Sequence, residues 1–140
     1  MPLLKSFLIF FCIFNILCSW CDSNNDPDTP EGSYTYTAYD STGVKIVEGW
    51  MKLVFDDSVN VSGKWNFKKI GNPENIGPQV GSGKLVGWFD EPTISINLNP
   101  NWADNNVFFH GDYSENIIEG EWMYSGFPGV INKGMFKAVK

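Results

Sequence analysis

The chain has 140 residues, of which 43% are hydrophobic and 19% charged, a balance that is typical of one globular domain. Its 10 basic residues are all lysines, and with 16 acidic residues they give a net charge of −6. An acidic chain without arginine repels nucleic acid and lacks the residue preferred for phosphate and base contacts, so the composition argues against a nucleic-acid partner.

The first 20 residues are typical of a signal peptide. Lys5 is their only charged residue, and an apolar run from Phe7 to Leu17 follows it. This run is too short to span a bilayer, which requires about 20 apolar residues, but it suits the core of an export signal. The sequence therefore predicts a protein that leaves the cytoplasm.

All three cysteines lie at the start of the chain, at Cys12, Cys18 and Cys21, so the domain that follows has no disulfide framework. Residues 21–32 are polar, acidic and rich in turn formers, which predicts a flexible tether. A cysteine directly after an apolar core resembles the signal peptide of bacterial lipoproteins. The resemblance implies that Cys21 carries a fatty acid such as palmitate and anchors the protein to a membrane of the cell envelope. Cleavage at Cys18 and ordinary secretion are the alternatives.

From residue 33 onward the sequence alternates and is rich in β-forming residues, without sustained helical periodicity. The first run places Tyr34, Tyr36 and Ala38 on one side and ends at a turn over residues 40–43. Seven further strands are predicted: Val44–Phe55, Val59–Ile70, Lys84–Phe89, Thr93–Asn99, Val107–Tyr113, Ile117–Ser125 and Lys133–Lys140. The longer connections are predicted as loops: Gly71–Gly83, Pro100–Asn106 and Gly126–Asn132.

Short connections between eight strands favour antiparallel pairing of neighbours, because parallel crossovers need a dozen or more residues. Eight such strands can close into a barrel whose interior holds side chains or one small ligand. The sequence therefore predicts an all-β fold, a single antiparallel up-and-down eight-stranded barrel over residues 33–140.

Glycine recurs two residues before an aromatic residue, an arrangement that places both on one face of a strand. Glycine allows a strand to bend, and a large ring can fill the space beside it. The rings either pack the barrel or line a ligand cavity, and one barrel can do both. The pairs are Gly32-Ser33-Tyr34, Gly63-Lys64-Trp65, Gly111-Asp112-Tyr113, Gly120-Glu121-Trp122 and Gly134-Met135-Phe136.

Three of these pairs, ending at Tyr34, Trp65 and Trp122, give the chain a resemblance to the calycin group of eight-stranded barrels. The group includes lipocalins, which place a glycine-x-tryptophan on the first strand, and avidins. The resemblance implies a barrel that binds small molecules or partner proteins inside the barrel or at its open end.

Residues for catalysis or metal binding are sparse. His110 is the single histidine, with Asp112 two residues further on, and this pair alone does not predict a catalytic apparatus. Zinc would require three or four assembled ligands, and no calcium loop or phosphate-binding loop is recognisable. We therefore expect a non-enzymatic protein without a metal or another cofactor.

The first functional hypothesis is a binding module that takes a small apolar or aromatic ligand into the barrel. Tryptophan rings form good walls for such ligands, and Trp102 lies in a predicted loop, where aromatic residues often make contacts. The alternative is a protein-interaction or inhibitor module with a packed barrel that makes contacts through the loops Gly71–Gly83 and Gly126–Asn132. The candidate ligand-binding residues are Trp50, Trp65, Trp88, Trp102 and Trp122.

Overall fold

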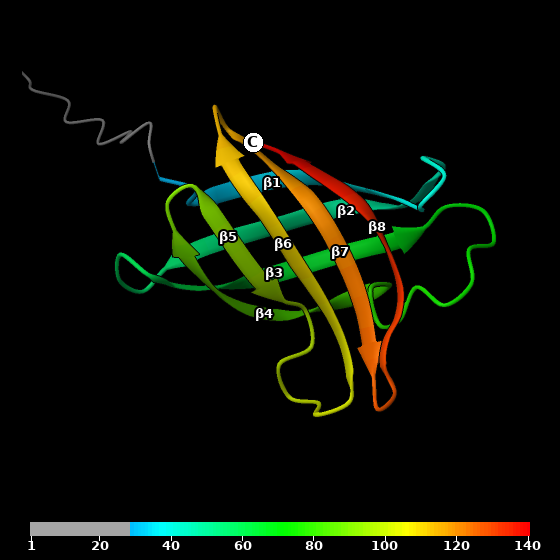
Figure 1. Ribbon diagram of the computed structural model, residues 1–140. Helices are drawn as coiled ribbons and strands as arrows, with labels where there is room; N and C mark the ends of the chain where they lie inside the picture. Colours follow the sequence, from blue (N-terminus) through cyan, green and yellow to red (C-terminus); the bar gives the residue numbers. More distant parts are fainter. Residues whose placement is uncertain (1–28) are drawn as a thin grey trace, which may run out of the picture.

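The computed structural model describes residues 29–140, so the predicted signal peptide, Cys21 and the tether up to residue 28 lie outside the described residues. The described chain forms eight antiparallel strands that close into a barrel in sequence order, and it contains no helix (Figure 1). The predicted all-β up-and-down barrel is therefore confirmed. The strands are β1 Gly32–Tyr39, β2 Lys45–Phe55, β3 Asn60–Lys69, β4 Gly81–Asp90, β5 Thr93–Asn97, β6 Asn105–Ser114, β7 Ile117–Gly126 and β8 Gly129–Val139.

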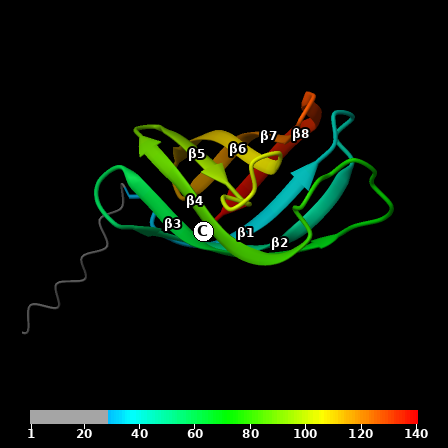
Figure 2. The same cartoon turned by 90° about the horizontal axis from the view of Figure 1, so that it is seen from below.

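The barrel closes because β1 pairs with both β2 and β8, as the view from below shows (Figure 2). Closure leaves no free strand edge onto which another strand could add. The two ends of the described chain meet at the same end of the barrel, where Lys140 Nζ donates a hydrogen bond of 3.3 Å to the carbonyl oxygen of Thr29. We call this end the proximal end and the opposite one the distal end.

The alternation of apolar and polar residues decides which side of each strand faces the core. On β1, Tyr34, Tyr36 and Ala38 are buried, whereas Ser33 and Thr35 between them are exposed. Burial of each large apolar side chain contributes about 1.5–3 kcal/mol to folding, so a shift of one residue in register would expose the whole set.

Glycines let large rings enter the barrel wall, although the ring that covers a glycine comes from the neighbouring strand. A Cβ atom on Gly83 would lie 3.0 Å from Trp65 Nε1, and one on Gly134 would lie 2.7 Å from Trp122 Nε1. Gly83 is the register partner of Trp65, and Gly134 is that of Trp122. At these two positions the glycine and the aromatic ring opposite it serve the packing of the barrel.

Most predicted strand ends lie within two residues of the observed ones, but the starts of β4 and β8 were wrong by three and four residues. β4 begins at Gly81 instead of Lys84. Its glycines have no side chain, so this part of the strand can pass beneath the Trp65 ring. The predicted loop Gly126–Asn132 is a tight turn, since Gly126 pairs with Gly129 and β8 begins there. Gly129 has a φ of +104°, a conformation that glycine adopts without strain.

Aspartates fix two of the turns. The Asp40 carboxylate accepts hydrogen bonds from the backbone N–H groups of Thr42 and Val44, at 2.8 and 2.9 Å, and from the Thr42 hydroxyl at 2.7 Å. The hydroxyl bond, followed by the bond from Val44, lowers the pKa of Asp40 below its ordinary value. Hydrogen bonds from Asn60, first its backbone N–H and then its side chain, together with one from Val59, lower the pKa of Asp57 in the same way.

Candidate functional site

Stacked aromatic rings fill the centre of the barrel. The Tyr36 ring lies 4.1 Å from that of Phe67 and 5.0 Å from that of Phe109, measured between ring centroids. Phe109 in turn stacks on Phe136 at 4.9 Å. Rings at these separations are in direct contact, so side chains occupy the space where a ligand of the barrel interior would have to bind.

The β3–β4 loop folds inward and covers the distal end of the barrel. Gln79 has no exposed surface, and its Nε2 donates a 2.8 Å hydrogen bond to the carbonyl oxygen of Ile76, which is also buried. Gln79 Oε1 lies 3.5 Å from the Tyr36 hydroxyl. The predicted contact loop Gly71–Gly83 is a loop up to residue 80, where β4 follows. Two of its side chains, Ile76 and Gln79, close the barrel instead of pointing into solvent.

The proximal end is also covered. The Tyr34 hydroxyl donates a 2.7 Å hydrogen bond to the carbonyl oxygen of Pro30, a buried residue just before β1. Burial raises the pKa of Tyr34 well above its ordinary value, with a smaller contribution from Tyr113, and burial alone raises the pKa of Tyr36. Both hydroxyls therefore stay neutral in the folded protein.

The five candidate tryptophans divide between the two sides of the barrel wall. Trp65 and Trp122 point inward, and their indole N–H groups donate to the carbonyl oxygens of Leu98 at 3.2 Å and Tyr39 at 2.8 Å. The other three lie on the surface, with exposed fractions of 49%, 45% and 61% for Trp50, Trp88 and Trp102. The structure therefore does not bring the five together in one wall.

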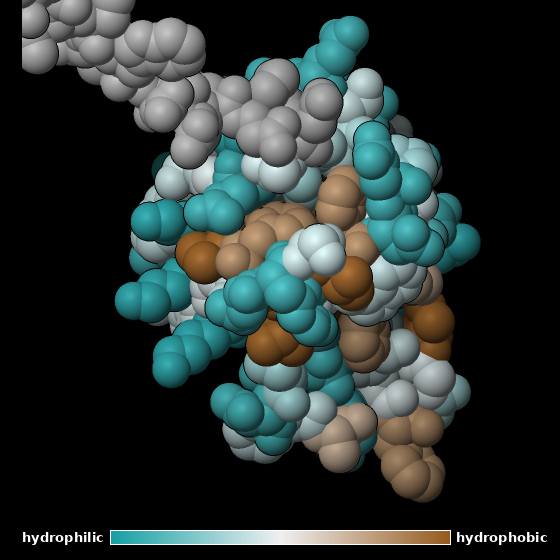
Figure 3. All heavy atoms as spheres, turned by 90° about the vertical axis from the view of Figure 1, so that its left-hand side faces the viewer, coloured by the Kyte–Doolittle hydropathy of each residue, from teal (hydrophilic) through white to brown (hydrophobic). Residues whose placement is uncertain are grey.

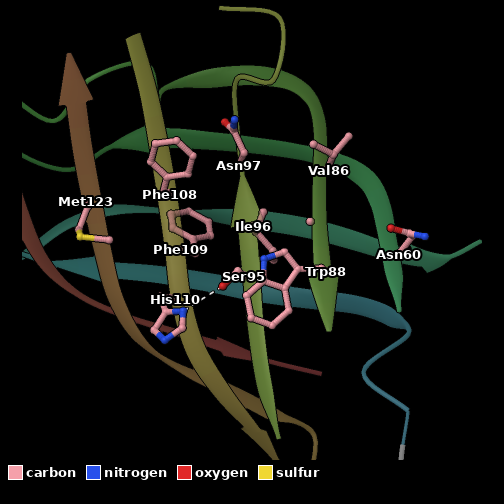
Figure 4. Close-up of a pocket in the computed structure, with 11 residues that line it drawn as sticks. Asn60, Val86, Trp88, Ser95, Ile96, Asn97, Phe108, Phe109, His110 and Met123 are labelled. Atoms are coloured by element: carbon pink, nitrogen blue, oxygen red, sulfur yellow. Dashed lines mark hydrogen bonds between the residues drawn. The ribbon is translucent and has the colours of Figure 1, made fainter. Parts of the chain in front are cut away.

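An open groove of about 620 Å³ lies on the outer face of β4–β7. The strand register places Trp88, Ser95 and His110 side by side, and Val86 and Phe108 lie in the adjacent row. In Figure 4 the Trp88 ring extends from β4 over β5 and lies beside Ser95. Its outward-facing lining has four apolar side chains, Val86, Trp88, Phe108 and Met123, and four polar ones, Asn60, Ser95, Asn97 and His110.

Ser95 and His110 are two hydrogen-bonded polar residues of this groove, and no sequence pattern indicated Ser95. Ser95 Oγ lies 2.9 Å from His110 Nδ1. Asp112, which the sequence placed beside His110, instead accepts a 2.9 Å hydrogen bond from Thr93 Oγ1. Glu121 is the register partner of His110 but faces Lys133 at 3.8 Å. The serine and histidine can donate to and accept from a ligand in the groove.

The distal end carries the most exposed large apolar side chains. Phe127, on the turn between β7 and β8, is 93% exposed, and Val130 is 59% exposed. Trp102 lies in the neighbouring β5–β6 loop, where its carbonyl oxygen accepts a 2.7 Å hydrogen bond from Asn106 Nδ2. Figure 1 shows this loop and the β7–β8 turn next to each other. The loop is thus fixed to the barrel while its indole ring remains in solvent.

On the side of the molecule that includes the β2–β3 turn, hydrophobic residues form separate patches between hydrophilic ones (Figure 3). Within residues 29–140, no group of three or more histidine, cysteine, aspartate or glutamate side chains could hold a metal ion. The same residues contain no helix that could cross a membrane.

The fold defines the chain as a small, closed, antiparallel eight-stranded β-barrel, an architecture consistent with the calycin group. Comparison of the sequence with protein-family models and with curated proteins, and of the structure with solved structures, finds no match. The assignment of function therefore depends on the geometry of this barrel.

Proposed function

We propose that the chain is an exported, non-enzymatic protein-interaction module built on a solid, calycin-like barrel. Its contacts are made by the distal loops that carry Trp102 and Phe127. The observation that carries the proposal is the group of exposed apolar side chains at the distal end, Phe127, Trp102 and Val130, because a group of such side chains, unlike a single one, is typical of an interaction site. The stacked rings inside the barrel favour this function over binding of a ligand inside.

The tether and the contact loops would lie at opposite ends of the barrel. β1 begins at the proximal end, whereas Phe127 and Trp102 lie at the distal end (Figure 1). A fatty acid on Cys21 would therefore hold the proximal end near the membrane and leave the distal loops free to meet a partner. Acylation at Cys18 and ordinary secretion without a lipid are the alternatives.

The proposed interaction can be tested by photo-crosslinking in the cells that produce the protein. A photoreactive phenylalanine analogue replaces Phe127 or Trp102 in the full chain, and the control carries it at Val44, a residue at the same end that is 58% exposed. We expect one discrete protein adduct from the analogue at position 127 and from the analogue at position 102. The adduct from position 127 should be lost when Trp102 is changed to serine, and the adduct from position 102 should be lost when Phe127 is changed to serine. Equal labelling from position 44, or no adduct at all, would contradict the proposal.

The lipid anchor has its own test, metabolic labelling with radioactive palmitate. We expect the full chain to be labelled and membrane-bound, and Cys21→Ala to lose both properties. Cys18→Ala is the matched control and should remain labelled. If Cys21→Ala stays labelled and Cys18→Ala does not, the acylated residue is Cys18. If neither the parent chain nor the two variants are labelled, the protein is not a lipoprotein.

A second candidate function is binding of a small apolar or aromatic ligand, and the outer groove beside Trp88 and Phe108 favours it. This site differs from the interior site expected from the sequence. The neutral dye N-phenyl-1-naphthylamine is a suitable probe, since its fluorescence rises in apolar surroundings. We expect saturable binding that Phe108→Ser abolishes and Phe127→Ser leaves unchanged. Binding unaffected by Phe108→Ser would exclude the groove.

A further inference from the structure

Three lysines lie directly opposite one another on the outer face of β2, β3 and β4. Lys52 is the register partner of Lys64, and Lys64 is the register partner of Lys84. All three side chains are exposed. Neighbouring strands are about 5 Å apart, so the three residues, which we call the lysine row, form a line of positive charge roughly 10 Å long.

The side chains of the lysine row are unpaired, whereas four of the six other described lysines, Lys45, Lys68, Lys133 and Lys137, have acidic partners. Lys68 contacts Glu48 at 2.9 Å and Lys137 contacts Glu119 at 3.4 Å, but no ion pair or hydrogen bond involves the row within residues 29–140. The positions before and after the row on the same face of β2–β4 contain no acid. They are Trp50, Asn66 and Ser82 on one side, and Val54, Ser62 and Val86 on the other.

Like charges at directly opposite positions destabilise a sheet. In a chain with 16 acidic residues and only 10 basic ones, three adjacent unpaired lysines are therefore not explained by folding. The row also borders a groove of about 650 Å³, and Pro100 and Asn101 of the β5–β6 loop form the other side of that groove. An anionic ligand would remove the repulsion and occupy this space.

We propose that the outer face of β2–β4 binds a linear polysaccharide that carries carboxylate groups. The lysine row pairs with the carboxylates of successive sugars. Trp50 and Trp88, which are 49% and 45% exposed, lie on the same face beyond the row on either side, roughly 20 Å apart along the sheet. Their rings stack on the C–H faces of the sugars, and this spacing suits an extended chain.

Small polar side chains complete the face. Asn66 and Ser82 lie in the row of Trp50, and Ser62 lies in the next row beyond the lysines. Amide and hydroxyl groups both donate and accept hydrogen bonds, as sugar hydroxyls require. The face therefore combines aromatic rings, neutral polar groups and fixed cations, which matches the three chemical elements of an acidic polysaccharide.

Two other polyanions fit less well. Acidic peptides are typically recognised by clusters of arginine, which the chain lacks, and the closed barrel has no edge to which a peptide strand could add. Nucleic acid is disfavoured by the absence of arginine, the residue preferred for phosphate and base contacts. Each of these ligands is an explicit outcome of the experiment below.

The experiment measures binding of the full chain to alginate and to hyaluronate by the change in tryptophan fluorescence and by co-sedimentation. Dextran serves as the neutral polysaccharide, polyglutamate as the acidic peptide and a single-stranded DNA oligonucleotide as the nucleic acid. We expect saturable binding to at least one of the two acidic polysaccharides and to none of the three controls. Failure of both, or equal or tighter binding of polyglutamate or DNA, overturns the proposal.

Variants locate the site. Lys64→Gln should weaken binding about fivefold, as expected for one exposed ion pair, and Trp50→Ala should weaken it as well. Lys137→Gln removes the same charge from a paired lysine on β8, and Phe127→Ala removes an exposed ring from the distal turn, so both should bind as the parent chain does. Equal loss in Lys64→Gln and Lys137→Gln would mean nonspecific charge attraction and would reject the site. Because Phe127 is the contact residue of the proposed protein interaction, the two proposals can fail independently.

Discussion

The two sides of the barrel wall have the same strands and backbone but opposite chemistry. Phe109 faces inward, is 1% exposed and stacks between Tyr36 and Phe136. Phe108, the preceding residue, faces outward, is 36% exposed and lines the outer groove. The comparison indicates that rings on the inner side hold the fold together, while rings on the outer side are free to recognise other molecules.

Truncation of these two neighbours should give the largest contrast. Phe109→Ala should lower the free energy of unfolding by about 3–5 kcal/mol, since it leaves a cavity among stacked rings. Phe108→Ala should lower it by less than about 1 kcal/mol, because water already covers part of the ring. Urea unfolding measures both. A small loss in Phe109→Ala would mean that the interior is loosely packed and has room for a ligand.

The inner side also limits the size of residues where strands approach closely. A Cβ atom on Gly120 would lie 2.1 Å from the carbonyl oxygen of His110, so Gly120→Ala forces the backbone of β6 and β7 apart and should cost about 1–3 kcal/mol. In Gly83→Ala the nearest atom belongs to the Trp65 side chain at 3.0 Å. We expect a smaller loss there. Equal melting temperatures for the two variants would contradict this ranking.

Alkaline pH should selectively weaken the inner side. The pKa values of Tyr34 and Tyr36 are raised in the folded protein, so both hydroxyls are neutral there but ionise in the unfolded chain above about pH 10. Their contribution to stability is complete below that pH and is lost as the pH rises, by about 1.4 kcal/mol per pH unit for one tyrosine. Urea unfolding of Tyr36→Phe should show a shallower loss between pH 10 and 12 than the parent chain. An identical slope would show that Tyr36 ionises while folded.

The sequence predicts the inner side much better than the outer side. Alternation places Tyr34 and Tyr36 on one face of β1, and the structure confirms that face as the core. The same pattern could have shown that Trp50 faces outward while Trp65 faces inward, because Trp50 alternates with the buried Met51 and Leu53. The outer side depends on register between strands, which alternation within one strand does not reveal.

The lysine row illustrates this limit. The turn at Asp56–Ser58 is short, and residues equally far from the centre of a short turn pair with each other. The sequence alone could therefore place Lys52 opposite Lys64. The connection from β3 to β4 is long, and the position of Lys84 depends on how that loop folds into the barrel around Gln79. Packing of a buried glutamine thus decides a surface feature, and no local pattern in the sequence indicates it.

Charges on the outer side should give the smallest effects, and their sign is informative. Lys137→Gln breaks a cross-strand pair with Glu119 and should lower the free energy of unfolding by a few tenths of a kcal/mol, whereas Lys64→Gln relieves repulsion and should raise it by a similar amount. Both changes should shrink in 1 M salt, where charges are screened beyond about 3 Å. Urea unfolding at low and high salt measures them. If Lys64→Gln destabilises the barrel at low salt, the lysine row contributes to folding, and its unpaired charge no longer argues for a ligand.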